Sequence, residues 1–290
     1  MGTEILRGEE AEKAVDILRE ALNNKADSFE IFLSMDKGIV AEVKDAEVDS
    51  FKVRSNIGVA IRTLNAGRAG FGFSSLLDLA ALRDMMDKTL SGSLELPIDR
   101  NLSFPSPIEE DIEESASEEI MDLVDPSIDE TTGEDYVERA RLIEESARAV
   151  SEKVDKVRKS SYSESFSATR LVNSNGVDTH HLATFFSGSV SAVATEAQES
   201  QIAWEINLGH KRSDVDPETV GKAAAERALS MLGAKQAETG RARAVIENTV
   251  AIDLLQAFSG AFLGDNVSKG KSMLSGLTGN KVVSKGITII

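Results

Sequence analysis

The hydrophobic period of this chain changes from that of a helix to that of a strand after residue 23. Residues 9–23 gather their apolar side chains on one face at helical spacing, which predicts an amphipathic helix. From residue 28 onward apolar and polar side chains alternate, as they do in strands with one buried face. This alternation returns at residues 57–61 and 202–208. Strands enclosed by helices predict an α+β fold, with antiparallel sheets flanked by helices.

Helical spacing returns at residues 76–90, 133–154, 217–232 and 249–262, where further helices are predicted. Asp216 followed by Pro217 is a typical helix start, because Asp caps the first turn and Pro fits it. Turn-forming residues, at Lys37-Gly38, Asn65-Ala66-Gly67 and Ser174-Asn175-Gly176, separate the predicted strands as hairpin turns.

These patterns predict a multi-domain chain with four regions. They are an N-terminal α+β domain at 1–95, an acidic linker at 96–132, a central domain of one helix plus β-rich structure at 133–236, and the start of a β-rich C-terminal domain at 237–290. The last region is expected to open with a strand at 242–246 and to hold a loop at 264–279. The chain ends on an apolar run at 286–290, which predicts either a larger protein cut here or a last strand that pairs internally.

The net charge of -17 is concentrated in one stretch of the chain. Fourteen of the 49 acidic residues lie between residues 101 and 138, where no Lys or Arg occurs, which leaves 35 acidic residues against 32 basic ones elsewhere. Such a chain lacks the basic surface of a nucleic-acid binder, so we expect no direct contact with nucleic acid. Residues 109–130 are interpreted as a solvated loop, with a docking surface for a basic partner as the alternative.

Composition also limits the compartment and the chemistry. The chain has no cysteine, which excludes disulfides and thiolate nucleophiles or ligands. No run approaches the roughly 18 apolar residues of a membrane helix, so no membrane contact is expected. The first twelve residues lack the basic and apolar regions of a signal peptide. We therefore expect a cytoplasmic protein.

The glycine-rich segments do not match phosphate-binding motifs. In the stretch 264–272 five residues separate Gly264 from Gly270, where a P-loop has four, and Asp265 stands at the position that the correct spacing would give to glycine. Its carboxylate would repel a phosphate. The glycines at 67–72 join two predicted strands and are interpreted as a hairpin.

The few histidines do not form a recognisable site. His180 and His181 are adjacent, so in a strand they point to opposite faces and cannot both bind one ion. The pair is interpreted as an ordinary exposed strand pair, with an acid–base or single-metal role of His180 with Asp178 as the alternative. No H-E-x-x-H or G-x-S-x-G sequence occurs, and the remaining candidates are interpreted as surface groups: His210, Glu196 and Glu199.

Several segments in a fixed order together resemble the TldD/PmbA family, also called modulators of DNA gyrase. They are Gly-Val-Ala-Ile-Arg at 58–62, Gly-Arg-Ala-Gly-Phe-Gly at 67–72, Leu-Val-Asn-Ser-Asn-Gly at 171–176, and the stretch 254–283 with Lys-Gly-Lys-Ser at 269–272 and Ser-Gly-Leu-Thr-Gly at 275–279. Because chains of this family are considerably longer, the resemblance covers roughly the N-terminal two thirds of its length.

The resemblance also indicates a branch of the family. Chains of the TldD type carry an H-E-x-x-x-H helix that binds zinc, whereas PmbA chains, also called TldE, lack it and pair with TldD. Here Gln256 replaces the first His, Ala257 the Glu and Ala261 the second His, while Gly260 matches a family glycine. The resemblance therefore implies no metal site and no catalytic residue in this chain, with the family's remaining zinc ligand beyond residue 290.

The resemblance implies a peptidase whose work is divided between chains. A TldD-type subunit would supply zinc and the general base, and this chain, paired with that subunit or with itself, would help admit an unfolded peptide as an extended strand. One alternative is a non-catalytic binding or regulatory protein, for example a DNA gyrase modulator that uses the acidic stretch at 109–130. Another is an independent hydrolase with an unrecognised site.

Overall fold

The structure is a computed structural model that describes residues 9–107 and 123–286. The chain divides into two compact units, unit 1 at Met1–Ala234 and unit 2 at Lys235–Ile290. The domain boundaries predicted at residues 95, 132 and 236 remain predictions. Residues 108–122 of the predicted acidic linker and residues 287–290 of the terminal apolar run lie outside the described residues.

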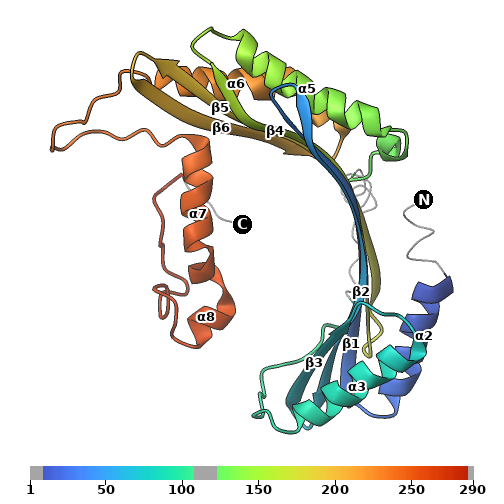
Figure 1. The fold of residues 1–290 in the computed structure, drawn as a ribbon. Helices are drawn as coiled ribbons and strands as arrows, with labels where there is room; N and C mark the ends of the chain where they lie inside the picture. Colours follow the sequence, from blue (N-terminus) through green and yellow to red (C-terminus); the bar gives the residue numbers. More distant parts are fainter. Residues whose placement is uncertain (1–8, 108–122, 287–290) are drawn as a thin grey trace. The chain divides into compact units, whose positions relative to one another are not determined.

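Unit 1 is built on one six-stranded antiparallel sheet with the strand order β3-β2-β1-β4-β5-β6 (Figure 1). The strands are β1 Ser28–Lys44, β2 Glu47–Asn65, β3 Arg68–Ser74, β4 Lys156–Asn173, β5 Asp178–Glu196 and β6 Glu199–Gly209. Every pair is formed by strands adjacent in the sequence except β1 and β4, whose register runs from Glu30 opposite Asn173 to Val43 opposite Ser160. The strands predicted from residue 28 onward, at 57–61 and at 202–208 therefore belong to a single sheet.

Four helices cover one face of this sheet, which confirms the predicted α+β class (Figure 1). They are α2 Glu9–Asn23, α3 Leu79–Ser93, α5 Gly133–Ala149 and α6 Pro217–Ser230. Asp216 caps α6 as predicted, since its side chain accepts a hydrogen bond from the Glu218 N–H at 3.2 Å. Thr132 and Asp135 form a capping box at the start of α5.

Two cores lie under the two helix pairs, on the same face of the sheet. Phe29 and Leu33 of β1 are buried under α2 and α3, whereas Ala41 and Val43 of the same strand are buried under α5 and α6. All four residues have odd numbers, and residues two apart in a strand share a face. The helices α5 and α6 approach closely at Gly221, where an added Cβ would lie 2.3 Å from the Ile143 carbonyl oxygen.

The predicted turn at Lys37-Gly38 is wrong, because β1 runs through both residues to Lys44. Gly38 instead allows a close approach between strands, since a Cβ there would lie 3.1 Å from the Ser165 Cβ. The chain turns at Asp45 and Ala46, which adopt positive φ angles of 55° and 62°. The other two predicted turns are confirmed, with Ala66, Gly67 and Gly176 at positive φ.

Unit 2 contains the helices α7 Asn248–Phe262 and α8 Gly264–Ser268, of which α7 was predicted. The strand predicted at 242–246 is wrong: the segment is irregular, and Val245 is 98% exposed. A strand needs a partner backbone, and no strand among the described residues pairs with this segment. The short helix α8 lies within the predicted loop at 264–279. Of the helices in the described ranges, none is both long and apolar enough to span a membrane.

Candidate functional site

The three positions that resemble an altered zinc motif lie on α7. Gln256 and Ala257 are exposed and Ala261 is half-buried. Among these side chains only Gln256 carries a possible donor, a neutral carboxamide, which is a poor zinc ligand. Across residues 9–107 and 123–286, no group of three or more His, Asp or Glu side chains gathers closely enough to hold a metal ion.

The segment after α7 folds back on the C-terminal end of that helix. The Asn266 side chain donates to the Gly260 carbonyl at 2.8 Å, and the Ser272 hydroxyl donates to the Ala261 carbonyl at 2.6 Å. The N–H groups of Lys271 and Ser272 in turn donate to the Asn266 carbonyl at 2.8 and 3.1 Å. These amides serve the turn itself, so they are not directed at a phosphate, which agrees with the failed match to a P-loop.

The two adjacent histidines lie in β5 and point to opposite faces, as strand geometry requires. His180 approaches Asp178 at 3.8 Å. Arg170 donates hydrogen bonds of 2.9 and 2.8 Å to Asp178 and thereby holds the pKa of that carboxyl below its usual range. Arg19 adds a third contact with the carboxylate at 3.3 Å. Asp178 is therefore part of a structural ion-pair group that joins β4 and β5 to α2.

Sequence reasoning missed a buried ionic cluster around Glu164 of β4. The Glu164 side chain is fully buried and accepts hydrogen bonds from four side chains, those of Tyr136 (3.2 Å), Tyr162 (3.0 Å), Thr131 (3.0 Å) and Arg212 (3.0 and 3.1 Å). Burial first, and the Glu164 charge second, raise the pKa of both tyrosines. The signal available in the sequence was an acidic residue at a strand position that the alternation places on the buried face, because a buried charge needs partners.

The cluster fixes the segment that follows the acidic stretch. The Arg212 N–H donates to the Asp125 carboxylate at 2.8 Å, and the Arg212 guanidinium donates to the Ser127 carbonyl at 2.6 Å. From β5, the Thr184 N–H donates to the Leu123 carbonyl, and its hydroxyl accepts from the Asp125 N–H, both at 2.8 Å. Residues 123–127 are therefore held firmly against the sheet.

A cavity of about 650 Å³ lies beside this cluster. Its walls come from β1, β2, β4, β5, α5 and the segment 124–129, and its apolar lining includes Ile39, Phe166 and Leu182. Glu164 and Asp125 also border it, but both carboxylates already accept hydrogen bonds from protein groups. Acid–base chemistry needs a group free to exchange a proton with a substrate, so these two residues serve the fold.

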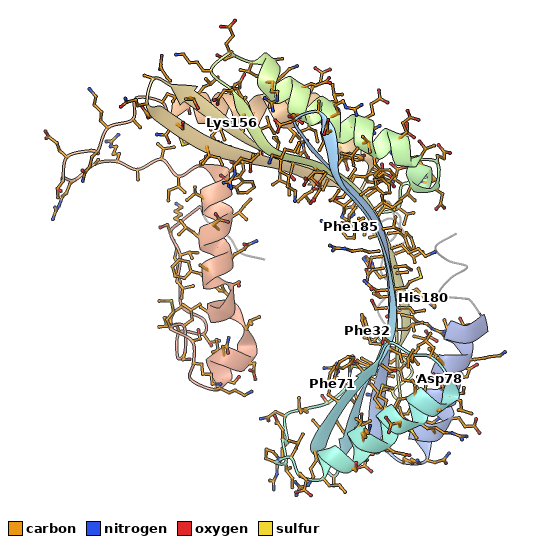
Figure 2. All side chains as sticks on the ribbon, in the orientation of Figure 1. Phe32, Phe71, Asp78, Lys156, His180 and Phe185 are labelled. Carbon is orange, nitrogen blue, oxygen red and sulfur yellow. The ribbon has the colours of Figure 1, made fainter. Side chains whose placement is uncertain are left out.

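The opposite face of the unit 1 sheet, which we call the open face, has none of the four helices α2, α3, α5 and α6 packed on it. Serine dominates its centre, at Ser161, Ser163, Ser165 and Ser167 of β4 and Ser187, Ser189 and Ser191 of β5. Aromatic side chains also lie on it, among them Phe32, Phe71 and Phe185, which are exposed (Figure 2). Exposed apolar side chains gathered on one face are typical of a surface that contacts other chains.

Three domain models of one protein family match the chain in order. Residues 29–92 match PmbA/TldA metallopeptidase domain 1, residues 126–232 the central domain, and residues 239–290 the C-terminal domain of that metallopeptidase. Together these matches extend over most of the chain.

Curated relatives show the same resemblance at low identity. The chain is 24% identical over 284 residues to Metalloprotease PmbA of Escherichia coli O157:H7, covering 96% of this chain and 61% of that protein. It is 23% identical over 249 residues to the Metalloprotease PmbA homolog of Buchnera aphidicola, covering 85% of this chain and 54% of that protein. The chain thus spans little more than half the length of these relatives.

Solved structures share the fold. A protein from Thermotoga maritima described as a modulator of DNA gyrase superimposes with a TM-score of 0.76 at 21% identity, covering 92% of this chain and 59% of that one. TldE from Thermococcus kodakarensis superimposes with a TM-score of 0.72 at 16% identity, covering 91% of this chain and 58% of that one.

Proposed function

Because the chain belongs to the PmbA/TldD metallopeptidase family, we propose that it is a subunit of a two-chain peptidase that carries no metal itself. The observation that supports this proposal is that α7 carries Gln256, Ala257 and Ala261 at the positions where the family resemblance leads us to expect the zinc ligands and the general base. We expect the partner to be a TldD-type subunit, or else a second copy of this chain, and we expect the complex to act in the cytoplasm.

The residues on α7 do not fit a zinc ion. Zinc sites in peptidases use imidazole and carboxylate ligands, and a carboxylate commonly serves as the general base for the bound water. Ala257 and Ala261 offer no donor atom, and Gln256 cannot act as a base. We therefore place zinc and the proton transfers in the partner and derive no chemical step for this chain.

The work left for this chain is binding and orientation of the substrate. Its sheet offers an open face and the edge strand β6, to which an extended peptide can add by main-chain hydrogen bonds. A peptide held as a strand has its scissile bonds exposed and its backbone aligned, which lowers the entropic cost of reaching an active site. Unfolded peptides or small proteins are the substrate class that such a surface fits.

The test is metal content and peptidase activity, measured for this chain alone, for a TldD-type chain from the same source, and for the mixture. Each chain is treated with a chelator and desalted before mixing, so that the chain that needs its metal can be identified. We expect cleavage of an unfolded peptide only in the mixture, zinc only in the partner, and loss of activity only when the partner has been chelated.

Each other outcome has a definite meaning. Stoichiometric zinc in this chain alone would contradict the assignment of α7. Activity of this chain alone that survives chelation would support an independent hydrolase. An inactive mixture in which the two chains nevertheless bind each other would support a regulatory binding protein.

A further inference from the structure

The strand β6 forms one edge of the unit 1 sheet. It pairs with β5 without a register shift from Glu199 opposite Glu196 to Gly209 opposite Phe186. In the described part of the chain no strand pairs with its outer side. An edge strand of this length presents a row of N–H and C=O groups that a further extended chain can use.

Two hydrogen bonds identify the residues whose backbone groups point outward. The Trp204 carbonyl accepts from the Arg227 guanidinium at 3.1 Å, and the Ile206 N–H donates to the Glu205 carboxylate at 3.2 Å. In an antiparallel pair the N–H and C=O of one residue point the same way, and the direction alternates along the strand. The backbone groups of Ile202 and Leu208 therefore point outward as well.

The same four residues carry the exposed apolar side chains of β6. Ile202, Trp204, Ile206 and Leu208 are 46%, 60%, 42% and 65% exposed, and they share the open face of the sheet. Outward backbone groups and exposed apolar side chains thus coincide at every second residue. An extended peptide with apolar side chains at alternate positions matches both features at once.

The usual protections of an edge strand are missing from β6. Lys, Arg and Pro are absent from its eleven residues, and its pairing contains no bulge. At the middle of the strand Glu205 forms an ion pair with Arg227 of α6, 3.2 Å apart. In this pair the Glu205 carboxylate accepts from the Ile206 N–H, and the Arg227 guanidinium donates to the Trp204 carbonyl. A peptide that paired with β6 would offer its own C=O and N–H groups to the same two positions.

We propose that β6 binds an extended peptide segment by strand addition, with the Glu205–Arg227 pair as the placeholder that the peptide displaces. The choice of a peptide as occupant rests on the proposed function. A second copy of the chain is a poorer occupant, because β6 carries Glu199 and Glu205 but no Lys or Arg, so two β6 edges side by side would bring like charges together. Glu205 beside the edge favours basic or neutral peptides over acidic ones.

Trp204 provides a direct assay, since it is the only tryptophan in the sequence. The probe is a blocked ten-residue peptide in which valine alternates with lysine and threonine. A peptide paired along β6 would cover the Trp204 ring, so we expect a blue shift of its fluorescence and weaker quenching by acrylamide. The same peptide with N-methyl groups on alternate residues keeps its side chains but loses strand donors, and we expect it not to bind.

Three variants separate strand addition from general hydrophobic contact. Ile206→Pro removes an outward N–H without breaking the ladder to β5, so binding should weaken more than about tenfold. Arg227→Ala frees the Trp204 carbonyl, and binding should tighten about fivefold. Phe73→Ser removes an exposed aromatic from the same face at the opposite edge, and it should leave the affinity unchanged.

Equal binding of the N-methylated and unmodified peptides to the unaltered chain would overturn the proposal, whether or not Ile206→Pro folds. A concentration-dependent Trp204 shift without peptide, with dimers in sedimentation, would also overturn it in favour of a second copy. Failure of the proposed function is a different result, namely a mixture with a TldD-type chain that binds the peptide at β6 but never cleaves it.

Discussion

Removal of the Arg212 guanidinium tests the assignment of the Glu164 cluster as a structural anchor. The Glu164 side chain is fully buried, while Arg212 is 19% exposed. Breaking a buried ion pair by removing one partner costs about 3–5 kcal/mol, because the remaining charge is left without compensation. Three hydroxyl donors, from Tyr136, Tyr162 and Thr131, stay in place, so we expect Arg212→Ala to cost about 3 kcal/mol, near the lower limit.

Thermal unfolding followed by Trp204 fluorescence measures this loss within unit 1. For a unit of this size about 3 kcal/mol corresponds to a fall in Tm of about 6–12 °C. Lys222→Ala is the matched control, because it breaks an exposed ion pair with Glu218 and should change stability by less than about 0.5 kcal/mol.

A second variant tests whether charge or lost contact causes the effect. Glu164→Gln added to Arg212→Ala neutralises the buried group but keeps an acceptor for the three hydroxyls. We expect the double variant to be about 1–2 kcal/mol more stable than Arg212→Ala alone. The reasoning is refuted if Arg212→Ala matches the Lys222→Ala control, or if the double variant is no more stable than the single one.

Three further predictions concern other contacts of unit 1. A hydrogen bond from Lys159, followed by one from Ser50, lowers the pKa of Glu42 from 4.5 to about 2. A carboxylate with a depressed pKa stabilises the fold above its unfolded pKa and loses this contribution as the pH falls. The unfolding free energy of Glu42→Gln, from urea titrations, should therefore decline less than that of the unaltered chain between about pH 5 and pH 2. Gly221→Ala forces a Cβ against the α5 backbone and should cost about 1–3 kcal/mol in thermal unfolding, whereas Gly92→Ala, in open space within α3, should be neutral or slightly stabilising. Thr184→Val removes the hydroxyl that accepts a hydrogen bond from the Asp125 N–H. The unfolding free energy of this variant, measured by urea titration, should therefore be lower by about 1–3 kcal/mol.

The periodic parts of the fold were predictable from the sequence. The helices at 9–23 and 133–149 and the strand around 57–61 follow from spacing alone, because each has one buried face that a regular pattern records. The alternation at 202–208 also predicted a strand correctly, but its apolar side chains are exposed on the open face and not buried as such a pattern predicts. The cap of α6 at Asp216 was equally local. That β1 pairs with β4 was not predictable, since more than a hundred residues separate their paired positions and no local pattern encodes this pairing.

The errors arose where one residue type serves two purposes. Gly38 has the flexibility for a turn, but the structure uses its missing side chain for a close approach to Ser165. The segment 242–246 has the composition of a strand, yet a strand also needs a neighbour. Glu164 was passed over because an isolated acid in an alternating strand resembles a surface residue, although its inward position in the alternation of β4 was an available signal. Its partner Arg212 is 48 residues away in the sequence, so no local pattern reveals the pair.

The α7 helix shows which part of the candidate site depends on geometry and which does not. Its apolar side chains are exposed around the helix, with Leu254, Leu255 and Phe258 between 43% and 50% exposed. A helix that is apolar on most sides is typical of the interior of a larger domain, and burial against further chain would alter the surroundings of all three side chains. Burial cannot give Ala257 or Ala261 a donor atom. The proposal of a subunit without metal on α7 therefore depends on residue identity, whereas the proposal for β6 depends on the sheet, and the two can fail separately.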